Sequence, residues 1–176
     1  MADYRESFKV EGLRELSQLM QKLPVEVARK HLVKGLKAGA KPVRDEAEAR
    51  APVLKEPDPR RRAGTLKRNI RIATVRQTDH DAAVKVGVRK LGAKAITAFK
   101  FKQWKAGRGI VGGAFNPDDP FYARFVEFGT SKMGAQPFLR PALYAQKETA
   151  IERMRQNLKP NVEAEARRMA WHKPGG

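Results

Sequence analysis

The sequence of 176 residues contains no cysteine and only three histidines and three serines. Without cysteine the chain can form neither a disulfide framework nor a thiolate zinc site, which excludes the small stapled domains of secreted proteins. The first residues, MADYRESFKVEGLREL, lack the apolar core of a signal peptide, and no apolar run is long enough to span a bilayer. We therefore expect a soluble product made in the cytoplasm, with one domain and short tails.

Residues that commonly carry catalysis are also scarce. The histidines lie far apart and have no partner at metal-ligand spacing: His31, His80 and His172. None of the serines lies in a GxSxG elbow. Asp118 and Asp119 could bind a hard cation, but in the sequence NPDDP they are more simply turn residues. We predict no enzymatic activity, no metal and no cofactor.

One glycine pattern could suggest a dinucleotide site. Gly107, Gly109 and Gly112 spell GxGxxG, which binds a pyrophosphate only where a strand precedes it and a helix follows. Phe115, Asn116, Pro117 and Pro120 do not permit that helix. A loop tip is the better interpretation.

The charge is strongly one-sided. Lys and Arg number 37 against 19 Asp and Glu, a net charge of +18, and residues 55–108 alone hold 16 bases and 4 acids. Such a block is typical either of a solvated face or of a surface that meets a polyanion, an acidic protein or an anionic membrane. We predict contact with a polyanion or an acidic partner through Arg60, Arg61, Arg62, Lys67, Arg68, Lys100, Lys102, Lys105 and Arg108.

Apolar spacing predicts helices first and a hairpin second. Residues 11–23 form a short amphipathic helix closed by Pro24, and a long helix follows from Val25 to about Ala47, with a kink or a restart at Pro42. In that helix Gly35 and Gly39 can permit close approach of another backbone. A loop at 51–65 precedes two strands, from Ile70 and up to Val88, joined through QTDHDA.

The second half of the chain is expected to be less regular. We expect 89–120 to be an extended or hairpin excursion, ended by a turn at NPDDP, and 121–130 to be a strand or a short helical turn. A helix from about Pro141 is predicted to stop at Pro160, with Leu143, Ala150, Met154 and Leu158 facing inward. Asn161 is expected to cap a last short helix.

Aromatic and basic residues interleave in AFKFKQWK. Phe99, Phe101 and Trp104 alternate with Lys100, Lys102 and Lys105, a composition found in stacking platforms for nucleic acids. The alternative is an edge strand whose lysines protect it from aggregation, and we favour it because no fuller nucleic-acid motif accompanies the stretch.

The stretch FVEFGTSKMGAQPFLRPAL, residues 125–143, combines aromatic, glycine and proline residues around one acid. Gly129 is expected to adopt a backbone conformation that residues with a Cβ resist, and Pro137 and Pro141 restrict the chain further. Glu127 is either a helix cap or an ion-pair partner of Arg140 or Arg124. A segment so stiff is suited to subunit contact, because little entropy remains to be lost on assembly.

Four motifs in this order resemble the neck or tail-completion proteins of long-tailed bacteriophages. FxVxGL is matched by Phe8, Val10, Gly12 and Leu13, AP-V by residues 51–53, and the entry to the sheet by Gly64, Thr65, Leu66 and Ile70. The most specific part, Y-(x)2-F-x-EFGT followed by PFLRPA, is matched by Tyr122, Phe125, residues 127–130 and residues 137–142. The likeness covers residues 8 to about 158. Two basic insertions, within 54–65 and 89–120, depart from the pattern.

The resemblance implies an α+β protomer without enzymatic activity, with a small, mostly antiparallel sheet packed by a long N-terminal helix and a C-terminal helix, and with extended basic loops. It implies a domain over 1–158, a helical tail over 159–176, and a ring, expected to be six-fold, between the head connector or head-closure proteins and the tail terminator or tail tube. The predicted subunit contacts are Tyr122, Phe125, Glu127, Phe128, Gly129, Thr130, Pro137, Phe138, Leu139, Arg140 and Pro141. Packaged DNA is a possible partner of the basic loops, and a membrane is not expected.

Two other functions remain open from the residues. A monomeric basic protein could bind RNA or DNA through 55–108 without assembling. A metal-dependent hydrolase would rest only on Asp118, Asp119 and the histidines.

Overall fold

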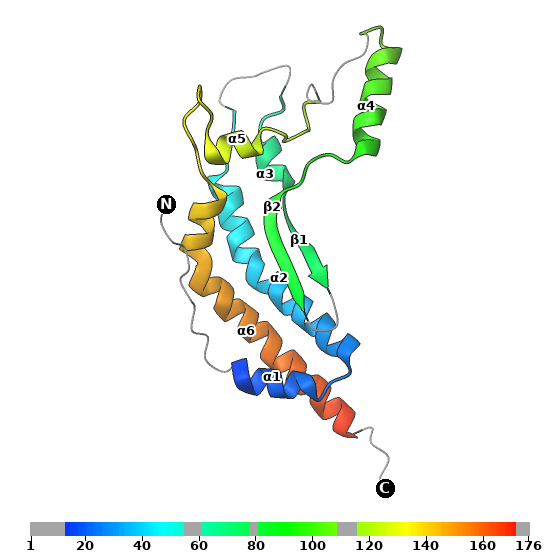
Figure 1. Cartoon of the computed structure of the whole chain (residues 1–176), viewed down its shortest axis with the longest axis vertical. Helices are drawn as coiled ribbons and strands as arrows, with labels where there is room; N and C mark the ends of the chain where they lie inside the picture. Colours follow the sequence, from blue (N-terminus) through cyan, green and yellow to red (C-terminus); the bar gives the residue numbers. More distant parts are fainter. Residues whose placement is uncertain (1–12, 55–60, 78–80, 109–115, 172–176) are drawn as a thin grey trace. The chain divides into compact units, whose positions relative to one another are not determined.

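The computed structural model describes residues 13–54, 61–77, 81–108 and 116–171 (Figure 1). In chain order the elements are α1 (Leu13–Gln21), α2 (Val25–Arg50), α3 (Thr65–Asn69), β1 (Ile70–Gln77), β2 (Ala82–Val88), α4 (Ala93–Lys105), α5 (Ala123–Phe128) and α6 (Leu139–Trp171). The strands β1 and β2 pair as one two-stranded sheet. This confirms the predicted α+β class, the hairpin and both long helices. Residues 78–80 of the hairpin turn lie outside the described part.

The described residues form two compact units. The first takes its described residues from 13–39, 74–77, 81–84 and 149–171, and the second from 40–54, 61–73, 85–108 and 116–148. The prediction of a single domain over 1–158 with a tail over 159–176 stays a prediction.

In the first unit α2 and α6 run antiparallel at very short range. A Cβ placed on Gly39 would lie 2.7 Å from the carbonyl oxygen of Ala150 and 3.0 Å from the Cβ of Met154, and a Cβ on Gly35 would overlap the side chain of Leu158. The two glycines therefore permit the close approach that the sequence suggested. Close packing of this kind gains many dispersion contacts.

The second unit contains a hydrophobic core built from α2, α3, β1 and α6. Its buried members are Ala47, Ala51, Leu66, Ile70, Phe138 and Ala142, and Val86 and Val88 of β2 pack against them. The core thus joins both long helices to the sheet. Leu66 and Ile70 belong to the sheet-entry motif, so that motif has a packing role.

The expected extended excursion at 89–120 is wrong, because 93–105 form the helix α4. Helix formers outweigh the loose alternation there: Ala, Lys and Gln dominate the segment, whereas only Ile96 and Thr97 are β-branched. The edge-strand alternative for AFKFKQWK is wrong for the same reason. The helix ends at Lys105, and Gly107 just beyond it has a φ of 71°, the left-handed conformation common after a helix C-terminus.

The predicted end of the C-terminal helix at Pro160 is also wrong, since α6 continues to Trp171 with Pro160 inside it. A proline inside a helix costs about 3 kcal/mol, but Leu158 and Val162 on either side of it are almost fully buried. Their packing offsets that cost. Asn161 caps no separate helix, and its side-chain amide donates to the carbonyl oxygen of Asn157. Helix α2 likewise runs through Pro42 without ending.

Candidate functional site

The stretch 125–143, called the corner below, comprises most of α5, a loop and the first turns of α6. Helix α5 ends at Gly129, whose φ of 75° and ψ of 179° form a combination that is open essentially to glycine alone. A Cβ there would lie 2.9 Å from the amide nitrogen of Ala135 and 3.0 Å from the carbonyl oxygen of Met133. The expectation for Gly129 is confirmed.

Backbone hydrogen bonds tie the loop of the corner back to α5. The N–H of Thr130 donates to the carbonyl oxygen of Met133 at 2.8 Å, and the two residues form an antiparallel bridge. The N–H of Gln136 donates to the carbonyl oxygen of Val126, also at 2.8 Å. The first bond closes the loop on itself and the second ties its far end to α5, so the loop has internal support before any partner binds.

Glu127 connects α5 to the start of α6. Its side chain is buried, and its two carboxylate oxygens accept hydrogen bonds from three successive backbone N–H groups, those of Phe138 at 2.8 Å, Leu139 at 3.0 Å and Arg140 at 3.1 Å. These are amides that a helix N-terminus leaves without an intrahelical partner. Glu127 therefore caps α6 from a distance of 11 residues or more in sequence, and its charge complements the helix dipole.

Both roles foreseen for Glu127 occur together. The guanidinium Nε of Arg140 lies 3.6 Å from the carboxylate, which identifies Arg140 as the ion-pair partner. Burial raises the pKa of Glu127, but the three backbone hydrogen bonds and the charge of Arg140 outweigh burial and hold that pKa below its usual value of 4.5. The carboxylate is therefore ionised at neutral pH and acts as a fixed structural anion.

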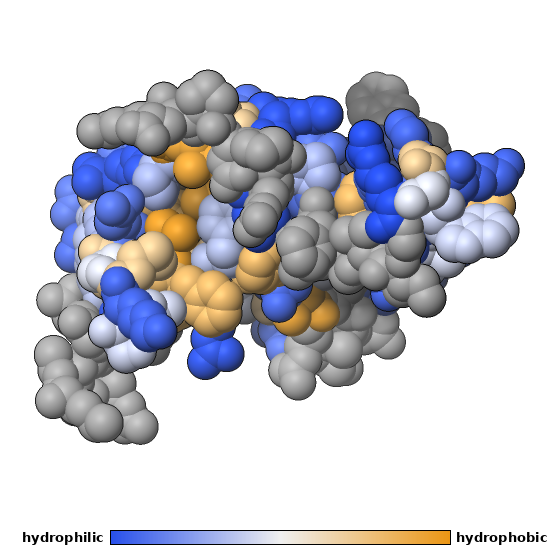
Figure 2. Space-filling view, turned by 90° about the horizontal axis from the view of Figure 1, so that it is seen from above, coloured by the Kyte–Doolittle hydropathy of each residue, from blue (hydrophilic) through white to orange (hydrophobic). Residues whose placement is uncertain are grey.

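Large apolar side chains are exposed around this fixed frame. Phe128 is 62% exposed, with the guanidinium of Arg140 at 5.0 Å from its ring centroid. Four others in the corner and the turn after it are exposed as well: Phe125, Met133, Leu143 and Tyr144. Seen from above, hydrophobic residues stand open between hydrophilic ones (Figure 2). These five residues, called the exposed apolar cluster below, lie close together in sequence on a frame held by hydrogen bonds, and exposed apolar residues of this kind are common in protein–protein contact sites.

The predicted contact residues divide by burial. Phe138 is fully buried in the core and Glu127 is buried as the cap, so both support the corner from inside. Phe125, Phe128, Thr130, Pro137 and Arg140 are exposed, whereas Tyr122, Gly129, Leu139 and Pro141 are partly exposed. Contact with another subunit stays a prediction for all of them.

Sequence reasoning missed Met133 and Tyr144 as members of the exposed cluster, and its prediction that Leu143 faces inward is wrong, because Leu143 is 51% exposed. For Leu143 and Tyr144 a signal was available, because they follow Arg140 at helical spacings of three and four and so share its face of α6. Met133 lies in a loop, where no periodicity could indicate its exposure.

The predicted polyanion contacts fall into two groups. Arg61, Arg62 and Arg68 bind within the protein: Arg61 lies over the rings of Phe121 and Tyr122, Arg62 pairs with Asp118 at 3.2 Å, and Arg68 donates to the carbonyl oxygen of Ala63. Lys67, Lys100 and Lys102 are exposed. Lys105 and Arg108 are exposed as well, with contacts to Phe101 and Gln103 of α4 itself, and Arg62 and Arg68 also remain exposed. Arg60 lies outside the described residues.

The acidic turn is structural. The N–H of Asp118 donates to the side-chain oxygen of Asn116 at 3.0 Å, the N–H of Asp119 donates to the carbonyl oxygen of Asn116 at 3.1 Å, and Asp118 pairs with Arg62. This confirms the expected turn at NPDDP. Within the described residues no group of three or more His, Asp or Glu side chains could hold a metal ion. No helix in the same ranges is long and apolar enough to cross a membrane.

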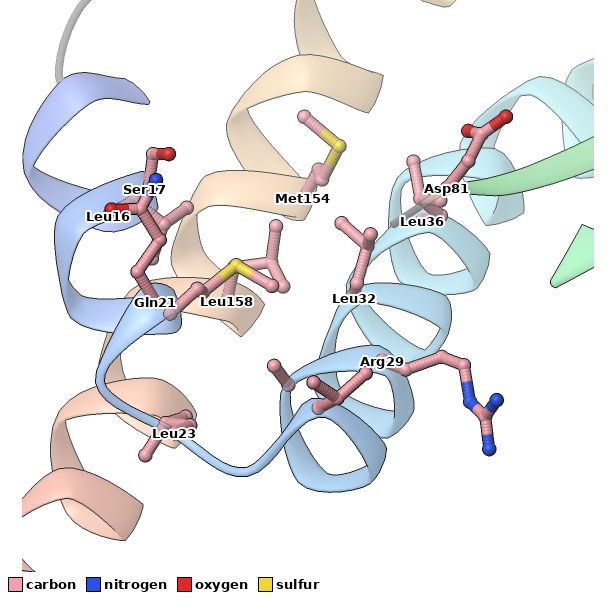
Figure 3. A pocket seen from close by; sticks show the side chains of 13 residues that line it. Leu16, Ser17, Gln21, Leu23, Arg29, Leu32, Leu36, Asp81, Met154 and Leu158 are labelled. Atoms are coloured by element: carbon pink, nitrogen blue, oxygen red, sulfur yellow. The ribbon is translucent and has the colours of Figure 1, made fainter. Parts of the chain in front are cut away.

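The first unit has a pocket of about 620 Å³ among α1, α2 and α6. Most of the side chains that line it are apolar, among them Leu16, Met20, Leu32, Met154 and Leu158, and Ser17, Gln21, Arg29 and Asp81 add polar groups (Figure 3). The lining offers no pair of groups arranged for acid–base or nucleophilic chemistry, so the corner is the better candidate site.

Comparison with known proteins gives one informative result. No curated protein and no solved structure matches the chain. A family described as the bacteriophage HK97-gp10 tail component matches residues 14–129. The match covers α1 from its second residue, α2 to α5, the two strands, and Gly129 at the start of the corner loop. The chain belongs to the HK97-gp10-like family of bacteriophage tail components.

Proposed function

We propose that this tail component works in the head–tail joining region, where it completes the tail and attaches it to the head connector as part of a homo-oligomeric ring. Its partners would be further copies of itself, in a ring expected to be a hexamer, the connector or head-closure proteins, and the tail terminator or tail tube. It would be made in the host cytoplasm and act as a structural protein in the virion.

The single observation that carries this proposal is the exposed apolar cluster on the frame held by Glu127 and Gly129. Aromatic residues and Arg are enriched in interface cores, and Phe128 stacked with Arg140 combines both. Because the loop is already hydrogen-bonded to α5, little further ordering is needed on assembly. In a ring each contact joins two different patches, so the corner would meet a second surface of the next copy.

The test compares two variants that each remove one exposed apolar side chain. Phe128→Ser changes the corner, whereas Val75→Ser changes a similarly exposed residue of β1. Light scattering would measure the mass of each protein alone and with tail tubes. We expect assembly for the wild type and for Val75→Ser, and a loss of at least tenfold in assembly affinity for Phe128→Ser, as for an aromatic hot spot worth about 2 kcal/mol. A wild-type chain that stays monomeric under both conditions contradicts the proposal.

A second function, a monomeric nucleic-acid-binding protein, is favoured by the exposed basic residues of α4. This function predicts strong, salt-sensitive binding of nucleic acid by a protein that does not associate with further copies of itself. The light-scattering experiment separates the two functions, because only a ring component gains mass without nucleic acid.

A further inference from the structure

Helix α4 is basic along its whole length. It holds Lys94, Lys100, Lys102 and Lys105 and no acid, Arg108 follows it, and none of its residues is buried. The least exposed large side chains, Ile96, Phe99 and Gln103, recur at spacings of three and four and mark one face. The opposite face is available to a partner.

The exposed surface of α4 presents aromatic rings beside ammonium groups. Trp104 is 61% exposed and Phe101 is 54% exposed, with ring centroids 5.8 Å apart. The ammonium of Lys105 lies 5.0 Å from the Phe101 centroid, a cation–π contact that restrains the lysine. Trp104 is therefore the more open ring, and it lies next in sequence to a positioned positive charge.

The basic residues before β1 differ in this respect. Arg61, Arg62 and Arg68 are engaged by rings, a carboxylate and a carbonyl oxygen of the protein itself. Moving them to an external anion would break those contacts. The basic block thus has two parts: the arginines before β1 contact groups of the protein itself, although Arg62 and Arg68 remain exposed, and the lysines of α4 are exposed on the surface of the helix.

We propose that α4 binds a nucleic-acid strand with unpaired bases, with a base stacked on Trp104 and phosphates held by the lysines of the helix. Each nucleotide offers one flat ring and one negative charge, which matches the interleaving of rings and ammonium groups. An interfacial membrane helix would instead separate an apolar face from a charged one, whereas here Ile96 and Phe99 are partly covered and the exposed rings lie among lysines. An acidic peptide would match the charges but would not require the rings.

The test uses the tryptophan fluorescence of the full-length chain. Trp171 is the only other tryptophan, so a Trp171→Phe background reports Trp104 alone. On titration with oligothymidylate of about 12 nucleotides, we expect quenching of Trp104. Four phosphate contacts predict roughly a 50-fold loss of affinity between about 50 and 200 mM salt. Trp104→Ala is expected to weaken binding on the order of tenfold, measured by anisotropy of a labelled strand.

A charge-matched control variant distinguishes binding at α4 from general electrostatic attraction between the strand and this positively charged protein. K94Q/K100Q/K102Q/K105Q removes four charges from α4, and K22Q/K30Q/K37Q/K41Q removes four exposed charges from the segment of α1 and α2. The first variant is expected to lose binding and the second to keep it. Equal weakening by the two sets, or no quenching of Trp104 by the oligonucleotide, overturns the proposal. So does binding only to a duplex with Trp104 unchanged, or equal Trp104 responses to anionic phosphatidylserine vesicles or polyglutamate.

This inference is independent of ring formation. The α4 variants are expected to assemble as the wild type does in light scattering, and Phe128→Ser is expected to bind the strand normally. A wild-type chain that assembles but does not bind the oligonucleotide would therefore contradict the α4 proposal and leave the proposed ring function intact.

Discussion

Glu127 and Gly129 hold the corner by different means, the first through a buried charge and the second through a backbone conformation. Two residues apart, they fix the start of α6 and the end of α5. Of these roles, the sequence allowed the conformation of Gly129 to be predicted, and it left cap and ion pair as alternatives for Glu127. Only the structure shows that one carboxylate reaches both the backbone N–H groups of α6 and the guanidinium of Arg140.

Glu127→Gln should lower stability in a pH-dependent way. The pKa of Glu127 is below its usual value of 4.5 in the folded state, so its carboxylate contributes stability fully above about pH 4.5, and this is lost as pH falls through the lower folded pKa. We expect a loss of about 1–3 kcal/mol in the free energy of unfolding at pH 7, and a smaller difference from wild type towards pH 3. Urea unfolding at several pH values measures both. Glu148→Gln, at an exposed position of α6, is the control. If the difference in unfolding free energy between Glu127→Gln and wild type stayed constant with pH, the proposed role of the ionised carboxylate would be wrong.

Gly129→Val should impair assembly more than it impairs secondary structure. The new side chain would occupy a backbone region that is strained for any residue but glycine, and its Cβ would meet the backbone of residues 133 and 135. Circular dichroism should stay close to that of the wild type while light scattering shows loss of the ring. Gly134→Val is the matched control in the same loop, because nothing lies within 4 Å of a Cβ there. Normal ring formation by Gly129→Val would refute the role of the corner.

At the scale of elements, a helix or strand was predicted correctly where the spacing of apolar residues was regular and the residue types agreed with it. Leucine and alanine spacing over many turns predicted α2, and alternation of the β-branched residues Val84, Val86 and Val88 predicted β2. In AFKFKQWK the alternation breaks before Trp104 and the residues between the rings are helix formers, so the short apolar pattern fits a helix as well as a strand. Pro160 misled for another reason: the packing that offsets its cost comes from residues distant in sequence.

Gly39→Ala tests the contact between α2 and α6. In an isolated helix this change stabilises by about 1 kcal/mol, but here the added Cβ would lie 2.7 Å from the carbonyl oxygen of Ala150. We expect the sign to reverse, with a loss of about 1–3 kcal/mol from overpacking. Gly87→Ala in β2, where a Cβ would meet nothing within 4 Å, should be neutral or slightly stabilising. Thermal unfolding of both variants gives the comparison, and a more stable Gly39→Ala protein would show that the helices separate easily.

At the scale of the whole molecule, the chain carries two surfaces of different chemistry that share no residue. The corner is apolar and aromatic, with its main charges paired inside it, whereas α4 displays lysines around exposed rings. Total charge and composition indicated that the chain meets a polyanion or an acidic partner, but they could not separate these surfaces. The separation depends on which arginines bind within the protein, and that is a tertiary property.

Ionic strength should therefore act on the two surfaces differently. Counterion release makes nucleic-acid binding fall steeply with added salt, whereas burial of apolar surface is little affected, or is strengthened by salts such as sulfate. Raising salt from about 50 to 200 mM should reduce strand binding by roughly 50-fold and leave the ring mass unchanged. Anisotropy and light scattering on the same samples measure both. Rings that dissociate in parallel with the strand would mean that the lysines, and not Phe128 and its neighbours, hold the subunits together, and the corner would then lose its place as the assembly surface.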